Sequence, residues 1–142
     1  MTTTHAVPTP STSKWTIGLW AAQIVLALLY TMPAYMKLTM SPDELMQMGL
    51  LWAGGAPLSL IRFIGLAELA GAIGLILPAA TRIMPQLTVT AAKGLLAIQA
   101  LAIPFHIYRG EFDALPFNMI FLGLSVLIIW GRTNKAPIAP RA

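Results

Sequence analysis

The chain has 142 residues, of which 57% are apolar and 10% are charged, and its mean hydropathy is +0.74. A domain of this size leaves a large share of its surface exposed, so this composition argues against a soluble globular protein or a disordered chain and favours a membrane protein. The chain has no cysteine, which removes disulfides and thiolate metal sites, and its net charge of +4 requires no nucleic-acid partner.

Residues 1–14 are rich in Thr, Ser and Pro, and we expect a disordered cytoplasmic tail there. Four apolar segments follow, at residues 15–36, 58–77, 84–107 and 115–130. A helix needs about 20 residues to cross the hydrocarbon, so the fourth segment is short and should draw on its flanks. The pattern predicts an all-α, integral membrane four-helix bundle over residues 15–132, and a second cytoplasmic tail at 133–142.

A shorter element is predicted between the first two spans, in the stretch SPDELMQMGLLWAGG at residues 41–55. Ser41 and Glu44 have the spacing of a capping box, and Pro42 suits the first helical position. Gly54 and Gly55 are expected to end this helix. Because the segment is too short to span, we predict an interfacial helix on the outer side of the membrane.

Basic residues outside the spans predict the orientation of the bundle. The side that holds both chain ends carries Lys14, Arg82, Arg132, Lys135 and Arg141, whereas the opposite side carries Lys37 and Arg109. Loops rich in Lys and Arg stay in the cytoplasm, so both termini are predicted to be cytoplasmic.

Two charged residues fall near the middle of predicted spans. Glu68 and Lys93 lie on neighbouring antiparallel spans at similar depth, which predicts an intramembrane Glu68–Lys93 pair. Gly65, Gly71 and Ala72 share the face of Glu68 and allow another helix to approach closely. Two interpretations remain open, a structural pair that neutralises both charges and a catalytic, proton-handling role for Glu68.

A second polar group is expected nearer the outer side. Arg62, Gln99, His106, Asn118 and Tyr30 come from all four spans and are candidates to line a ligand-binding pocket inside the bundle. The alternative interpretation is that Arg62 extends to lipid headgroups and His106 marks a helix end.

Several stretches resemble the DoxX-like family of small four-helix bacterial membrane proteins. They are YMKL at the end of the first span, IGLAELAGAIGLILP in the second, HIYRGEF after the third, and IIWGR at the end of the fourth. Lys37, Glu68 and His106 fall on positions that match the family pattern. The chain departs from that pattern at Tyr35-Met36, where a glycine is usual, and at Lys93, where a small or apolar residue is usual.

The resemblance implies a multi-pass protein of the bacterial cytoplasmic membrane. It also suggests a small membrane subunit or anchor of a quinone-linked redox assembly, with a quinone as cofactor and redox subunits as partners. The alternatives are a stand-alone membrane enzyme that uses Glu68 for acid–base chemistry on a lipophilic molecule, and a non-catalytic binding protein. Besides the lipid bilayer, a second copy of the chain is a candidate partner. We expect no metal site and no covalently bound cofactor.

Overall fold

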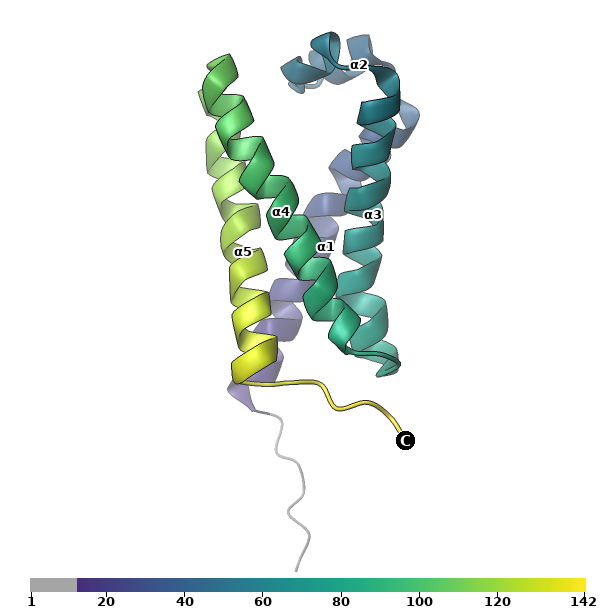
Figure 1. The fold of residues 1–142 in the computed structure, drawn as a ribbon, viewed down its shortest axis with the longest axis vertical. Coiled ribbons are helices and arrows are strands. Elements are labelled where there is room, and N and C mark those ends of the chain that lie inside the picture. Colours follow the sequence, from purple (N-terminus) through teal and green to yellow (C-terminus); the bar gives the residue numbers. More distant parts are fainter. Residues whose placement is uncertain (1–12) are drawn as a thin grey trace, which may run out of the picture.

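The structure is a computed structural model that describes residues 13–142 (Figure 1). Within this range four long helices run alternately up and down: α1 (Lys14–Thr39), α3 (Leu58–Thr81), α4 (Gln86–Arg109) and α5 (Leu115–Asn134). All four are long and apolar enough to cross a membrane. The prediction of an all-α four-helix membrane bundle is confirmed. Most of the predicted N-terminal tail, residues 1–12, lies outside the described residues.

The two ends of the bundle differ in what they carry. The first, which we call the loop end, carries the short helix α2 (Pro42–Gln47) and the 3-10 turns η1 (Leu51–Gly55) and η2 (Phe112–Ala114). The opposite tail end holds the start of α1, the α3–α4 turn and the end of α5. Trp15 and Trp130 meet edge to face there, with ring centroids 5.3 Å apart, as expected for aromatic residues at one membrane boundary.

The predicted interfacial helix is present but is broken in two. The capping box forms as predicted: the Glu44 amide donates to Ser41 Oγ at 3.3 Å, and the Ser41 amide donates to Glu44 Oε2 at 2.7 Å. Helix α2 nevertheless ends at Gln47, because Gly49 adopts a φ of +94° and turns the chain. Gly54 and Gly55 therefore lie in a 3-10 turn instead of ending the helix.

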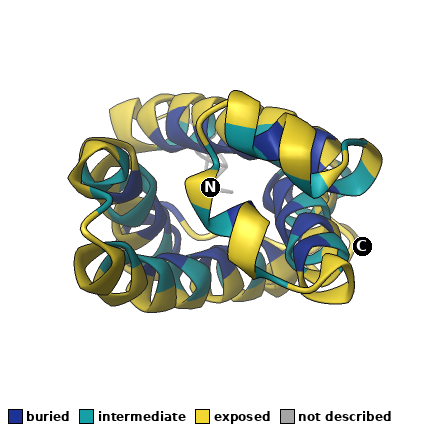
Figure 2. Ribbon diagram, turned by 90° about the horizontal axis from the view of Figure 1, so that it is seen from above, coloured by how far each residue is buried: buried dark blue, intermediate teal, exposed yellow. Residues whose placement is uncertain are grey.

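The bundle exposes apolar side chains on its outside. Buried residues on α1 recur every three or four positions and include Leu19, Leu26 and Tyr30. In Figure 2 the buried parts of the long helices face the interior of the bundle, whereas large apolar residues such as Leu28 and Leu101 are exposed. This pattern suits a bundle surrounded by lipid, since lipid chains satisfy the outward-facing apolar surface.

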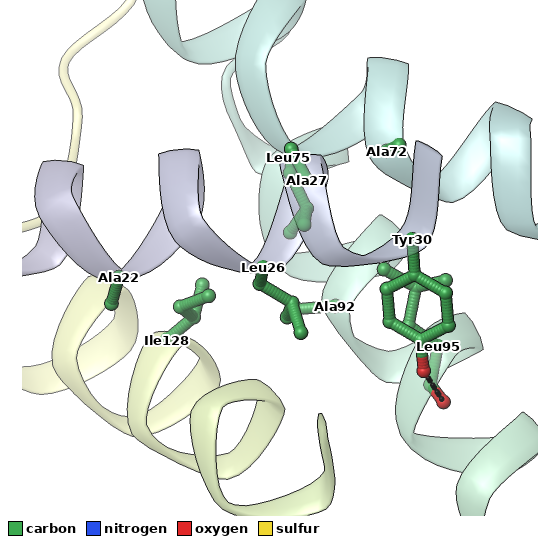
Figure 3. Close-up of a cluster of buried hydrophobic side chains, with 9 residues drawn as sticks. All are labelled: Ala22, Leu26, Ala27, Tyr30, Ala72, Leu75, Ala92, Leu95 and Ile128. Atoms are coloured by element: carbon green, nitrogen blue, oxygen red, sulfur yellow. Dashed lines mark hydrogen bonds between the residues drawn. The ribbon is translucent and has the colours of Figure 1, made fainter. Parts of the chain in front are cut away.

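An apolar layer occupies the middle of the bundle. Leu26 of α1, Leu75 of α3, Leu95 of α4 and Ile128 of α5 are each at most 1% exposed and pack together with small alanines between them (Figure 3). Buried polar side chains lie on both sides of this layer, toward the loop end and toward the tail end.

Candidate functional site

A buried ion pair joins α1 to α3 in the loop-end half of the bundle. Lys37 Nζ donates to both carboxylate oxygens of Glu68, at 2.9 Å and 2.8 Å. The two side chains are only 7% and 6% exposed. A buried charge is costly unless an opposite charge and hydrogen bonds compensate it, so each of these residues depends on the other.

Helix direction explains why these two side chains meet. In an α-helix the Cα–Cβ bonds lean toward the N-terminus. Helix α1 runs from the tail end to the loop end, so Lys37 leans into the membrane, whereas α3 runs the other way and Glu68 leans toward Lys37. Gly65, one turn from Glu68, lets α1 approach: a Cβ at this position would lie 3.0 Å from Lys37 Cβ and 3.2 Å from the carbonyl oxygen of Ala34.

The predicted Glu68–Lys93 pair is wrong. Glu68 lies 13 residues before the end of α3 and Lys93 lies 7 residues after the start of α4. Across the short turn, these counts separate the two residues by about 9 Å along the bundle axis. Lys93 also leans toward the tail end, is exposed, and forms no ion pair within the described part of the chain.

The structure joins two of the predicted ligand-binding residues directly. Gln99 Nε2 donates to the Tyr30 hydroxyl at 2.7 Å, and that hydroxyl donates to the Leu95 carbonyl at 3.4 Å (Figure 3 shows Tyr30 beside Leu95). The Tyr30 ring also packs on the Phe121 ring, with centroids 4.6 Å apart. Phe121 lies one helical turn after the buried Asn118 on α5.

These residues form what we call the central polar cluster, namely Tyr30, Lys37, Glu68, Gln99 and Asn118. Two of its polar atoms, Gln99 Oε1 and Asn118 Nδ2, are buried without a hydrogen-bond partner among residues 13–142. Buried polar groups are nearly always paired, so an unpaired acceptor and an unpaired donor favour a site that accommodates a polar ligand or a water molecule.

The other two predicted pocket residues have different partners. Arg62 is half-buried and its Nη1 donates to the Lys37 carbonyl, which supports the end of α1 that carries the ion pair. His106 lies at the loop end, where its Nδ1 is 2.7 Å from Glu111 Oε2. Arg109 Nε donates to the other oxygen of that carboxylate at 2.7 Å. His106 thus belongs to a loop-end ion cluster and has no hydrogen bond to the central polar cluster in the described structure.

The loop-end cluster changes the acidity of Glu111. Partial burial of this carboxyl favours its neutral form and raises its pKa, but hydrogen bonds and charges from Arg109 and His106 outweigh that effect and lower the pKa below its usual range. The carboxylate therefore remains ionised and connects the end of α4 to the segment before α5.

Sequence reasoning missed a polar group at the tail end. Gln23 is fully buried: its Nε2 donates to the Leu75 carbonyl at 2.6 Å, and its Oε1 accepts from Arg132 Nε at 2.6 Å. Arg132 is 4% exposed, although its position near a helix end made it look like a cytoplasmic surface charge. Lys37 was assigned to the outer surface for the same reason. The direction in which each side chain leans was the available signal for both.

An apolar groove lies beside the central polar cluster, between α1 and α3. It has a volume of about 350 Å³ and is lined mainly by aliphatic side chains, among them Leu28, Leu69, Ile73 and Ile76. Thr31 and Leu69 of the groove directly follow Tyr30 and Glu68 in the sequence. The groove and the cluster therefore occupy adjacent faces of the same two helices, and neither Tyr30 nor Glu68 lines the groove.

Comparison with known proteins identifies a family for this chain. No curated protein and no solved structure matches it. The model of the DoxX-like family matches residues 21–128, a stretch that contains the central polar cluster and all but the outermost turns of the four long helices. Since this match covers well over half of the sequence, the chain belongs to the DoxX-like family.

Proposed function

We propose that this protein is a quinone-binding membrane subunit, or anchor, of a redox assembly. The observation that carries the proposal is the pair of unsatisfied atoms in the central polar cluster. Asn118 Nδ2 is a donor that suits a quinone carbonyl, and Gln99 Oε1 is an acceptor that suits a quinol hydroxyl. Gln99 lies ten residues before the loop end of α4 and Asn118 lies three residues after the start of α5, so both belong to the loop-end half of the bundle, within the depth that a lipophilic headgroup can reach from the bilayer.

The groove between α1 and α3 fits the rest of such a ligand. A quinone carries an apolar isoprenoid tail, and the groove offers an aliphatic surface facing the lipid. In this proposal the tail lies along Ile73 and Ile76 while the headgroup enters between α1 and α3 toward Gln99. The Lys37–Glu68 pair adds a fixed dipole beside the headgroup.

Reduction of a quinone to a quinol takes two electrons and two protons. The chain has no cysteine, and His106 is its single histidine in the described part, where it is bound to Glu111. The proposal therefore assigns electron delivery to a partner subunit with its own redox centre, and assigns to this chain the binding and orientation of the quinone.

We also propose that the protein lies in the bacterial cytoplasmic membrane with both termini in the cytoplasm. With Lys37 and Arg132 buried, the exposed basic residues at the tail end are Lys14, Arg82, Lys135 and Arg141, against Arg109 at the loop end. The loop end also carries the acidic residues Asp43, Glu44, Glu111 and Asp113. This asymmetry supports a cytoplasmic tail end.

Quinone binding to the full chain in nanodiscs tests the proposal. A short-chain ubiquinone analogue should bind the wild type, and Gln99→Leu and Asn118→Leu should each weaken binding about three- to tenfold, the value of one hydrogen bond. Ser125→Ala is the matched control, because Ser125 is equally buried but its hydroxyl donates to Phe121 O within its own helix at 2.8 Å.

Equal affinity in all three variants, or no binding by the wild type, would contradict the proposal. Turnover of a lipophilic substrate by the purified chain alone would instead support a stand-alone enzyme that uses Glu68 as acid or base. Co-purification with soluble redox subunits would support the assembly.

A further inference from the structure

A second cavity lies at the tail end, on the other side of the apolar layer from the central polar cluster. Its volume is about 380 Å³, and it is lined by the first turns of α4, the end of α5 and the C-terminal segment. Thr88, Lys93 and Arg132 supply polar or charged groups to its lining, and Pro137, Ile138 and Pro140 form the wall contributed by the C-terminal segment.

The C-terminal segment is held in place across this cavity. In Figure 1 it runs from the end of α5 past the tail end toward the α3–α4 turn. Arg82 in that turn donates from Nε to the Ala139 carbonyl at 3.0 Å and from Nη2 to the Pro140 carbonyl at 3.3 Å. The Arg141 amide returns a hydrogen bond to the Arg82 carbonyl at 3.0 Å. These bonds make the segment a wall of the cavity.

Two residues that line the cavity carry buried donors that the protein does not satisfy. Arg132 uses Nε for Gln23 and Nη1 for the Ala136 carbonyl at 3.2 Å, but its Nη2 has no hydrogen-bond partner among residues 13–142. The hydroxyl of Thr88, which is 1% exposed, likewise has none in the described structure. Two unsatisfied donors on residues that line one cavity call for an acceptor.

The guanidinium of Arg132 also lies 5.6 Å from the centroid of the Trp20 ring, but no side-chain carboxylate in the described structure balances its charge. The five acidic side chains of the chain are Asp43, Glu44, Glu68, Glu111 and Asp113, all of which lie at the loop end or on α3. No side-chain carboxylate is therefore available to Arg132 or to Lys93. A guanidinium that is 4% exposed normally has an anionic partner, because burial of an unpaired charge is costly.

We propose that the tail-end cavity binds a phosphate group, with Arg132 and Lys93 as its cationic partners and the Thr88 hydroxyl as a further donor. A guanidinium offers parallel donors that match phosphate oxygens, and an ammonium adds a second positive charge. The cavity lies at the end of the bundle where Trp15, Trp130 and Lys135 gather, which is the depth of lipid headgroups. The phosphate comes either from an anionic lipid or from a soluble phosphate.

Thermal unfolding of the full-length protein tests this site and separates the two sources. One arm compares nanodiscs of pure phosphatidylcholine with nanodiscs that contain phosphatidylglycerol, and the other adds inorganic phosphate against an equal ionic strength of chloride. A ligand that binds the folded state raises the unfolding temperature. Stabilisation by phosphatidylglycerol alone identifies a lipid headgroup, and stabilisation by inorganic phosphate identifies a soluble ligand.

Lys93→Gln and Thr88→Val are the test variants, because neither residue makes a side-chain hydrogen bond or ion pair in the described structure. Lys14→Gln is the matched control, since Lys14 is an exposed lysine at the same end of the bundle that does not line the cavity. Lys93→Gln should weaken ligand binding at least about tenfold and Thr88→Val about threefold, while Lys14→Gln leaves it unchanged.

Arg132→Gln should abolish the stabilisation by phosphatidylglycerol or phosphate. If loss of the Arg132–Gln23 contact prevents this variant from folding, Lys93→Gln still tests the site. The proposal is overturned if neither phosphatidylglycerol nor inorganic phosphate raises the unfolding temperature. It is also overturned if Lys93→Gln and Lys14→Gln reduce the effect equally.

Discussion

The Lys37–Glu68 ion pair gives the sharpest test of the packing between α1 and α3. Lys37 Nζ lies within 2.9 Å of both oxygens of Glu68, and both side chains are almost fully buried. Replacing either residue alone with Met leaves the other charge buried without a partner, which should lower the free energy of unfolding by about 3–5 kcal/mol. Replacing both with Met removes both charges and should cost much less than either single change.

Reversible unfolding in mixed micelles, followed across increasing sodium dodecyl sulfate, measures these differences. Lys93→Met is the matched control, because Lys93 is an exposed lysine that also lies inside a membrane-spanning helix; it should change the free energy of unfolding by no more than about 0.5 kcal/mol. Additive losses in the Lys37 and Glu68 variants would show that the two side chains do not interact. A large cost for Lys93→Met that disappears in the Glu68→Met background would instead restore the Glu68–Lys93 pair.

Three further predictions concern packing, pH and topology. Gly65→Ala should destabilise the bundle by about 1–3 kcal/mol in the same assay, because the added Cβ meets α1, whereas Gly123→Ala, with nothing within 4 Å, should be neutral or slightly stabilising. Because the pKa of Glu111 is lowered in the folded state, its contribution to stability is present above the ordinary carboxyl pKa of about 4.3 and is lost as the pH falls through the lower folded-state value. The difference between the unfolding temperatures at pH 7 and below pH 4 should therefore be smaller in Glu111→Gln than in the wild type. An equal difference in the two proteins would contradict this prediction. In intact cells an impermeant maleimide should label Gln47→Cys at the loop end but not Ala142→Cys at the tail end, and the reverse labelling would invert the proposed topology.

The helices were predictable because their signals are local and strong. Runs of apolar residues long enough to span the bilayer predicted all four long helices, and the capping box at Ser41 and Glu44 predicted the start of α2. The ends were less predictable: α3 continues through Pro78 to Thr81, one turn beyond the predicted end. A proline near the end of a membrane helix is tolerated when neighbouring groups satisfy the freed carbonyl, and sequence alone does not reveal those neighbours.

The candidate site was predicted by residue type more successfully than by pairing. Tyr30 and Gln99 were predicted only as candidates to line the same pocket, and the structure joins them by a hydrogen bond. The partner of Glu68 depends on helix register, which the extra turn of α3 changes by several ångströms. Lys37 and Arg132 were assigned to the membrane surface because basic residues near helix ends usually reach the headgroups. In this bundle both side chains lean inward, as the direction of each helix indicates, but the local sequence does not reveal the polar partners that they meet on other helices.

The proposed quinone site is tested most directly by photolabelling with a quinone that carries an azido group on its headgroup. The full chain in nanodiscs would be irradiated with this probe, and the labelled peptides identified by mass spectrometry. The account predicts labels on the buried faces of α1, α4 and α5 around Tyr30, Gln99 and Asn118, and their loss when excess unlabelled quinone is present. Labels confined to lipid-exposed residues such as Leu101 and Met119, or labels that excess quinone does not displace, would contradict it.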